Sequence, residues 1–129
     1  MRVIGIGTDI VECARIRRMI ERHGELFLAR VFTEKEMQYC QARKKATEHF
    51  AAFWAAKESV LKAIGLAGRN GVSWTQIEIR HDSEGRPSVA LFGSLRDAAA
   101  KLKIKQFLVS LSHCRTYATA SAIAQTGDV

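Results

Sequence analysis

Long hydrophobic runs are absent from this sequence, and none approaches the roughly 20 apolar residues that a membrane-spanning helix requires. The opening residues Met1-Arg-Val-Ile lead directly into glycines and Asp9, an apolar run too short for a signal peptide. Cysteines are few: Cys13, Cys40 and Cys114 are odd in number and widely spaced, which argues against a disulfide framework or a zinc site and favours reduced thiols. These absences predict a cytoplasmic protein without a membrane segment.

Acidic residues are scarce relative to basic ones: 13 Asp and Glu against 20 Lys and Arg give a net charge of +7. An excess of positive charge favours an acidic partner, such as nucleic acid, an anionic membrane, a phosphorylated ligand or an acidic protein. No internal repeat, linker or low-complexity segment divides the chain, so residues 1–129 are expected to form a single domain.

Residues 3–11 are expected to form a buried first strand, in which Gly5 and Gly7 would let another backbone or a ligand approach closely. This Gly-x-Gly pattern lacks the third glycine and the later acidic residue of a dinucleotide-binding fingerprint. Asp9 is an unusual carboxylate within an apolar strand. Taken alone, it is best explained as a cap for the next helix or as a partner of a nearby amide.

The remaining pattern predicts four helices and four further strands. Helices are expected over residues 12–23, from the capping box at Thr33 to about Cys40, over residues 48–64 between an N-cap at Thr47 and a stop at Gly65, and after a cap at Ser94 with Leu95, Ala98, Ala99 and Leu102 facing inward. Strands are expected over residues 72–79 and 86–92, which form an antiparallel hairpin, and over residues 107–112 and 117–124. The segment from Leu26 to Phe32 is expected in the core, residues 69–71 in a turn, and residues 125–129 in a frayed tail.

The central helix, residues 48–64, has one face of large apolar side chains and a second face of alanines, so it is expected to have neighbours on both sides. Lys57 falls in the middle of the large apolar face, and Glu58 and Lys62 fall along its edge. A buried charge without a partner costs several kcal/mol, so each is expected to meet a protein counter-charge, a metal or a ligand. The alternatives are that Lys57 extends to water and that Glu58 and Lys62 form a surface pair worth about 0.2–0.5 kcal/mol.

Asp9 and Glu58 lie on two elements expected in the core, and their hard oxygen atoms are ligands of the kind that suits Mg²⁺. Lys62, His113 and the basic cluster at residues 43–45 would then neutralise phosphate charge, a constellation that fits transfer chemistry on a diphosphate. A single histidine after a strand is more often a helix cap or a hydrogen-bonded core residue, so the interpretation of His113 depends on the others.

One side of the helix over residues 12–23 presents Arg15, Arg18, Met19 and Arg22. Three arginines beside a methionine suit docking on an acidic, partly apolar partner. A solvated charged face is equally compatible with the sequence alone.

Several of these residues resemble the motifs of one family, the holo-[acyl-carrier-protein] synthases, the small bacterial type of 4′-phosphopantetheinyl transferase. Gly7-Thr-Asp9 followed by Arg15 is similar to the family's N-terminal motif. Phe53-Trp-Ala-Ala-Lys-Glu-Ser-Val-Leu-Lys-Ala63 resembles its central signature, which is long and specific. Ser110-Leu-Ser-His113 resembles its C-terminal motif, and Gly85-Arg-Pro87 its hairpin turn.

The resemblance, which runs from Val3 to about Ala122, implies an α+β fold with a small antiparallel sheet packed around the long central helix. It implies Mg²⁺-dependent transfer of the 4′-phosphopantetheine arm of coenzyme A to a serine of an apo acyl carrier protein, in lipid and fatty acid biosynthesis, with adenosine 3′,5′-bisphosphate as by-product. It further implies a homotrimer with active sites between subunits, which neither binds nucleic acid nor enters a membrane.

The resemblance also implies roles for individual residues. Asp9 and Glu58 would hold Mg²⁺, and Asp9, Glu58 and Lys62 would form the catalytic group, with the serine proton taken by Glu58, Asp9 or a metal-bound water. The residues around coenzyme A would be Lys44, Lys62, Pro87, Ser112 and His113, with His113 near the 3′-phosphate; those facing the acidic carrier protein would be Arg15, Arg18, Met19 and Arg22. Lys57 is left serving either the ligand or the protein.

Two other functions compete with this one. The net charge of +7 is compatible with a small nucleic-acid-binding module, although basic residues alternate with acidic ones, as in residues 30–36, and no recognition helix or stacking aromatic pattern is evident. A coenzyme A binder without turnover is the third hypothesis.

Overall fold

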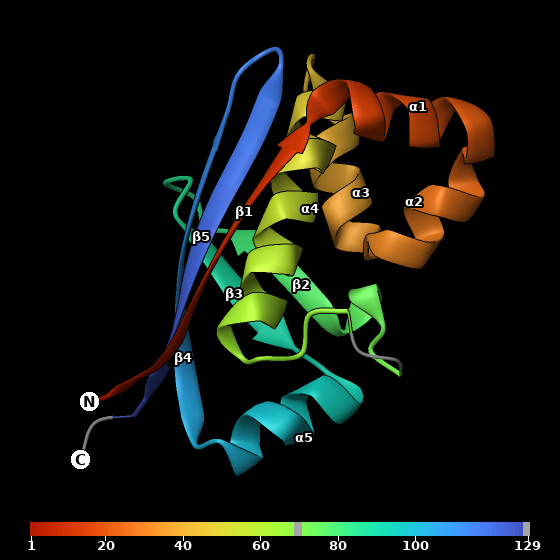
Figure 1. The fold of residues 1–129 in the computed structure, drawn as a ribbon. Helices are drawn as coiled ribbons and strands as arrows, with labels where there is room; N and C mark the ends of the chain where they lie inside the picture. Colours follow the sequence, from red (N-terminus) through yellow and green to blue (C-terminus); the bar gives the residue numbers. More distant parts are fainter. Residues whose placement is uncertain (69–70, 128–129) are drawn as a thin grey trace.

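A long helix, α4 (Ala46–Ala63), runs through the middle of the molecule and has secondary structure on both sides, as its two apolar faces predict (Figure 1). The structure is a computed structural model that describes residues 1–68 and 71–127. The predicted turn at residues 69–71 therefore lies partly outside the described residues.

One side of α4 is covered by a three-stranded antiparallel sheet with the order β1-β5-β4 (Figure 1). Its strands are β1 (Val3–Glu12), β4 (Ile104–His113) and β5 (Tyr117–Thr126). Every second residue of β5 is a buried alanine, from Ala118 to Ala124. Small side chains at these positions let the sheet lie close against α4.

Gly5 and Gly7 of β1 bring the strand into direct contact with the backbone of α4. A Cβ atom at Gly5 would overlap the carbonyl oxygen of Ala63, and one at Gly7 would overlap that of Ser59. The prediction that these glycines permit a close backbone approach is confirmed, and the approaching group is the helix.

Substitution of Gly7 by alanine is expected to lower the free energy of unfolding by about 3 kcal/mol or more, because backbone atoms on both sides must move apart. Gly127→Ala is the matched control, since its added Cβ meets only the flexible side chain of Lys105. Urea unfolding of the two variants measures the difference. Equal stability of both would show that β1 and α4 separate without cost.

The other side of α4 is covered by helices α1 (Cys13–His23), α2 (Glu25–Val31) and α3 (Glu34–Gln41) and by the hairpin of β2 (Ile77–His81) and β3 (Pro87–Leu91). Helix α5 (Gly93–Lys101) packs against β4 near the end of the sheet. The predicted end of the first helix at Gly24 and the capping box at Thr33 are both confirmed.

The prediction of a buried first strand is wrong for one of its two faces. Ile6 is 69% exposed and Ile10 66% exposed in the single chain, on the side of the sheet away from α4. Leu108 of β4, opposite Ile123 of β5, adds a side chain that is 45% exposed to the same surface. Gly5 and Gly7 thus allow one face of β1 to pack against α4, whereas Ile6 and Ile10 make the other face apolar and solvent-exposed.

Several predicted boundaries also shift. Helix α4 begins at Ala46 after Lys45, so Thr47 is inside the helix and does not cap it. Residues 74–76 form a 3₁₀ helix before β2, where a strand was expected. Helix α5 follows Phe92, and the hydroxyl of Ser94 bonds the side chain of Gln76 and does not cap α5.

Three side chains lie elsewhere than predicted. Leu26 is 81% exposed and Leu102 43% exposed, although both were expected in the core. Thr126 belongs to β5 and accepts a hydrogen bond from the backbone amide of Arg2, so the predicted tail is partly ordered by the sheet. In the part of the chain that the structure describes, no helix combines the length and hydropathy needed to cross a membrane.

All three cysteines carry free thiols, as predicted, but their environments differ. Cys13 and Cys40 are buried, and burial raises the pKa of both thiols. Cys114 is exposed, and hydrogen bonds from the backbone amides of Tyr117 and Thr116 lower its pKa.

Thiol reagents are therefore expected to label Cys114 first, with one thiol per chain reacting rapidly near neutral pH and the other two only after unfolding. Mass spectrometry after brief alkylation identifies the modified residue. Cys114→Ser should remove the rapid phase; a rapid phase that persists in this variant would place another thiol at the surface.

Candidate active site

Asp9 of β1 lies close to the part of α4 that carries Glu58, because Lys62, four residues after Glu58 in the helix, bonds Asp9. The ammonium group of Lys62 lies 3.1 Å from Oδ1 of Asp9 and 2.9 Å from the carbonyl oxygen of Thr8. Burial raises the pKa of Glu58, and the nearby charge of Asp9 raises it further, while Lys62 and Arg15 act in the opposite direction. The two carboxylates are therefore close enough to repel each other, and Lys62, which pairs with Asp9, compensates part of their charge.

This geometry replaces two of the sequence-based alternatives. Lys62 of α4 pairs with Asp9 of β1, so it is not merely the surface partner of Glu58 within the helix. Asp9 does not cap α1, whose N-cap is Glu12. Two converging carboxylates next to a single lysine are a donor set that fits a divalent cation, whose charge would relieve their repulsion.

A second group of predicted residues lies toward the N-terminal end of α4. Nδ1 of His113 lies 2.9 Å from Oε1 of Glu48, in the first turn of that helix. Lys44 is exposed just before the helix. Glu48 and Glu58 are ten residues apart, a helical rise of about 15 Å. The carboxylate pair and His113 therefore occupy separate regions of one chain.

Ser112 is not on the same side of the sheet as His113. It pairs with Thr119, which is exposed, whereas His113 pairs with the buried Ala118. Side chains of directly paired residues share a face, so Ser112 faces away from α4. The residues expected around coenzyme A thus lie on both faces of the sheet within a single chain.

An array of stacked rings, which the sequence did not reveal, connects the hairpin to His113. The ring of His81 stacks on Tyr39 with centroids 4.5 Å apart, and the Arg43 guanidinium lies 3.4 Å from the centroid of Tyr39. His49 contacts His113 edge-on at 4.7 Å. Burial lowers the pKa of both His49 and His81, which favours neutral imidazoles.

The hairpin carries Pro87 to this array, because Pro87 pairs directly with His81. Lys44 follows Arg43 in sequence. Three residues from distant segments of the chain therefore lie next to this array: Lys44 as the sequence neighbour of Arg43, Pro87 as the strand partner of His81, and His113 as the ring neighbour of His49. Nothing in the local pattern of the sequence placed Tyr39 or His81 in this region.

Lys57 has a structural partner, which settles the question left open by the sequence. Its ammonium group lies 2.6 Å from Oε1 of Glu36, and both side chains are fully buried. It also donates to the carbonyl oxygens of Val31, Trp74 and Ile77. The alternative that Lys57 extends to water is therefore wrong.

Glu36 is the residue that completes this buried pair. Beyond its capping-box bond with Thr33, its second oxygen accepts a hydrogen bond of 2.7 Å from the amide of Ile79. The sequence predicts that a buried Lys57 requires a counter-charge, but only the fold identifies Glu36 as the partner.

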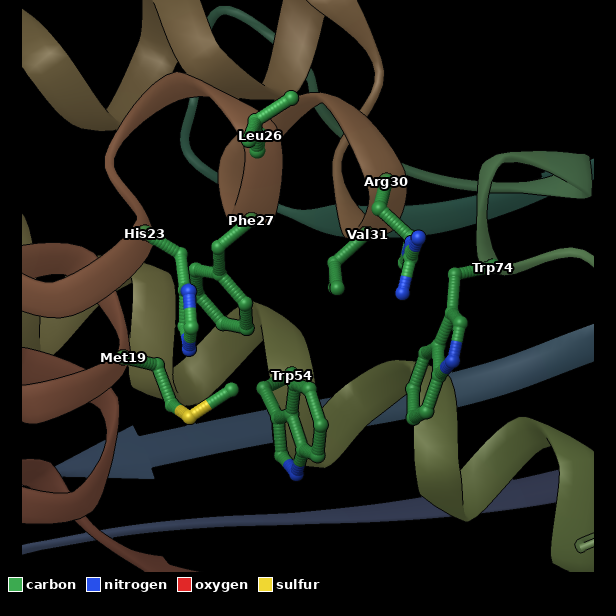
Figure 2. A pocket seen from close by; sticks show the side chains of 8 residues that line it. All are labelled: Met19, His23, Leu26, Phe27, Arg30, Val31, Trp54 and Trp74. Atoms are coloured by element: carbon green, nitrogen blue, oxygen red, sulfur yellow. The ribbon is translucent and has the colours of Figure 1, made fainter.

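Met19, one of the predicted docking residues of α1, lines a surface pocket of about 330 Å³. Figure 2 shows Met19, Phe27 and Trp54 converging on it, with Trp74 beside Trp54. The two indole rings stack at 4.5 Å, and the Arg15 guanidinium lies 5.6 Å from the Trp54 ring. The lining residues are Met19, His23, Leu26, Phe27, Arg30, Val31, Trp54 and Trp74.

Exposed arginines accompany this apolar pocket. Arg30 of α2 lines it, whereas Arg18 and Arg22 are exposed on α1, the helix that contributes Met19 and His23 to the lining, without lining the pocket themselves. Lys57 holds part of the lining in place, because it donates to the carbonyl oxygens of the lining residues Val31 and Trp74. The surface offers apolar contact next to positive charge.

The chain is similar to known proteins over nearly its whole length. Residues 5–122 match the family model of the 4′-phosphopantetheinyl transferase superfamily. The holo-[acyl-carrier-protein] synthase of Rhodopirellula baltica is 48% identical over 124 residues, which span 95% of this chain and 98% of that protein.

Solved structures agree with this match. The crystal structure of holo-[acyl-carrier-protein] synthase from Neisseria meningitidis has a TM-score of 0.88 at 31% identity, over 97% of this chain and 100% of that one. The Helicobacter pylori synthase, solved in complex with coenzyme A, has a TM-score of 0.82 at 27% identity, over 93% and 99% of the two chains.

Proposed function

The chain belongs to the 4′-phosphopantetheinyl transferase superfamily and, within it, to the holo-[acyl-carrier-protein] synthases, and from this premise we propose the details of its reaction. It transfers the 4′-phosphopantetheine group of coenzyme A to a serine of apo acyl carrier protein and releases adenosine 3′,5′-bisphosphate. The observation that supports this most directly is the approach of Asp9 and Glu58 beside Lys62.

In the proposed reaction Asp9 and Glu58 would hold Mg²⁺, which would supply Lewis-acid stabilisation of charge on phosphate oxygens. Lys62, oriented by Asp9 and the carbonyl oxygen of Thr8, supplies a fixed positive charge beside the leaving group. Glu58, whose pKa is raised, is the group proposed to take the serine proton.

The direct test is incubation of the protein with coenzyme A, Mg²⁺ and an apo acyl carrier protein, followed by mass spectrometry of the carrier. The expected result is the mass increase of one phosphopantetheine group, abolished by a chelator and restored by Mg²⁺. A carrier that remains unmodified, while a known transferase modifies it in parallel, would refute the proposal.

The carrier protein is proposed to dock on the pocket beside α1. Its negative charges would meet Arg15, Arg18 and Arg22, while apolar side chains would meet Met19 and the two tryptophans. Complementary charge of this kind accelerates association more than it strengthens the final complex.

Arg22→Glu is therefore expected to raise the KM for the carrier roughly tenfold at low salt, with the KM for coenzyme A unchanged. Arg96→Glu makes the same change in charge at an exposed site on α5, a helix that contributes no residue to the lining of the pocket, and serves as the control. Initial rates at varied carrier and varied coenzyme A separate the two constants. An equal rise in the KM for the carrier in both variants would show that the carrier responds to the net charge of the protein and not to a docking site beside α1.

A homotrimer with active sites between subunits is proposed as the working assembly. The outer face of the sheet exposes Ile6, Ile10 and Leu108, an apolar surface suited to burial against another chain. A site between subunits would also account for the placement of Ser112 and His113 on opposite faces of the sheet. Sedimentation equilibrium should give about three times the mass of one chain, 14.4 kDa.

A further inference from the structure

Glu48 and His113 form a dyad between the start of α4 and the end of β4. The distance from Nδ1 of His113 to Oε1 of Glu48 is 2.9 Å. The Glu48 side chain is 11% exposed, and that of His113 is 29% exposed. The contact joins residues far apart in the sequence, so it forms only when the sheet packs on α4.

The dyad determines which nitrogen of His113 remains available. A carboxylate accepts hydrogen bonds, so Glu48 selects the form of the ring that carries a proton on Nδ1. Nε2 is left for another partner. His49 contacts the same ring edge-on with centroids 4.7 Å apart, which restricts its rotation.

The surroundings keep Glu48 available for this role. The hydrogen bond from His113 lowers the pKa of Glu48, and the charge of Lys45 acts in the same direction. Glu48 also lies in the first turn of α4, where a negative charge stabilises the helix. Its side chain is nevertheless directed at His113, and this contact is more specific than a helix-end charge requires.

We propose that Glu48 is a positioning residue for coenzyme A, which orients His113 so that Nε2 meets the 3′-phosphate of the ligand. The inference rests on the proposed function and on the expectation, implied by the family resemblance, that His113 lies near that phosphate. With Nδ1 held by the carboxylate of Glu48, the ring presents Nε2 to the phosphate, and in its imidazolium form it would donate from both nitrogens, to Glu48 and, through a charge-assisted hydrogen bond, to the phosphate.

The discriminating ligand is 3′-dephospho-coenzyme A, which lacks only this phosphate. Glu48→Gln keeps a hydrogen-bond acceptor but removes the charge, whereas Glu48→Leu removes both. Asp97→Asn on α5 is the matched control, because it removes one exposed carboxylate from another element. Kinetic constants for both cofactors, with the same carrier, are measured for each variant and the parent protein.

The expected result is a rise of about tenfold in the KM for coenzyme A in Glu48→Leu, the equivalent of one charge-assisted hydrogen bond, with a smaller rise in Glu48→Gln. The kcat should be unchanged, and the constants for the dephospho compound should change less than about twofold. Asp97→Asn should match the parent protein with both compounds.

Equal losses with the two compounds, or a fall in kcat at constant KM, would overturn the proposal and leave Glu48 as a helix-end residue. Calorimetric binding of both compounds supplies a readout that needs no turnover. If the parent protein binds coenzyme A but transfers nothing, the proposed function is refuted. If the parent protein transfers normally and both Glu48 variants discriminate between coenzyme A and the dephospho compound as it does, only the role of Glu48 is refuted.

Discussion

Glu58→Gln is expected to reduce phosphopantetheine transfer by roughly a thousandfold, about 4 kcal/mol of transition-state stabilisation. The amide preserves the shape of the side chain but removes the negative charge that would hold Mg²⁺ together with Asp9. Lys62 would then face a single carboxylate, and the group proposed to accept the serine proton would be absent. The rate of formation of modified carrier, measured by mass spectrometry, gives the effect directly.

The loss cannot be attributed to unfolding, because the variant is expected to be at least as stable as the parent protein without metal. The pKa of Glu58 in the folded protein lies above its ordinary value of 4.5, owing first to burial and then to Asp9. Its contribution to stability is therefore complete below that ordinary value and is lost as the pH rises through the raised pKa. Above the raised pKa the ionised carboxylate opposes folding, and glutamine removes this effect.

Glu34→Gln, at an exposed position in the first turn of α3, is the matched control and should transfer at the parent rate. Thermal unfolding without metal should rank Glu58→Gln at or above the parent protein. Retention of more than a tenth of the parent rate by Glu58→Gln would remove this residue from the reaction centre.

Lys57→Met is expected to produce the largest loss of stability, about 3–5 kcal/mol. The substitution leaves the fully buried Glu36 without its counter-ion and leaves three carbonyl oxygens, two of them in buried hydrogen bonds, without their donor. Burial lowers the pKa of Lys57 and raises that of Glu36, and each charge counteracts the shift of the other. The pair persists because the two charges and the surrounding hydrogen bonds compensate each other.

A double-mutant cycle separates the pair from its surroundings. Lys57→Met and Glu36→Gln should each be strongly destabilising, because each leaves one buried charge without its counter-charge. The double variant has no such charge, so its loss of stability should be smaller than the sum of the two single losses. Lys101→Met, the same change at an exposed position, should alter the free energy of unfolding by less than about 0.5 kcal/mol. Strict additivity in urea unfolding would contradict the pairing.

The position of Lys57 connects stability to the docking surface. Its hydrogen bonds hold the backbone at Val31 and Trp74, both of which line the pocket beside α1. Residual carrier binding by a Lys57 variant should therefore decline before coenzyme A binding does. The central motif thus contains a structural lysine and a site carboxylate at adjacent positions, Lys57 and Glu58, which point to different environments.

Sequence reasoning succeeded where the decisive interactions are local. The capping box at Thr33 depends on two hydrogen bonds within one helical turn, and the sequence predicts it without knowledge of the fold. The antiparallel hairpin of β2 and β3 was predicted for the same reason. Thr47 was misassigned because propensity at a helix start is weak compared with the packing that carries α4 back to Ala46.

The exposed face of β1 marks a different limit. An apolar strand is expected to be buried, but the sequence of one chain does not state whether burial comes from its own helices or from another subunit. Ile6 and Ile10 remain exposed in the single chain, so the expectation of a buried strand fails for the chain and supports the proposed assembly.

By itself, the sequence determined most of the helices and strands, though neither α2 nor the 3₁₀ helix at residues 74–76, as well as the excess of positive charge and the need of several charged residues for partners. Only the tertiary structure decided which partners they receive: Glu36 for Lys57, Asp9 for Lys62 and Glu48 for His113. The physical reason is that secondary structure depends on hydrogen bonds over a few residues, whereas pairing of buried charges depends on how closely distant segments approach. That approach is set here by glycines and alanines whose absent side chains bring β1 and β5 against α4.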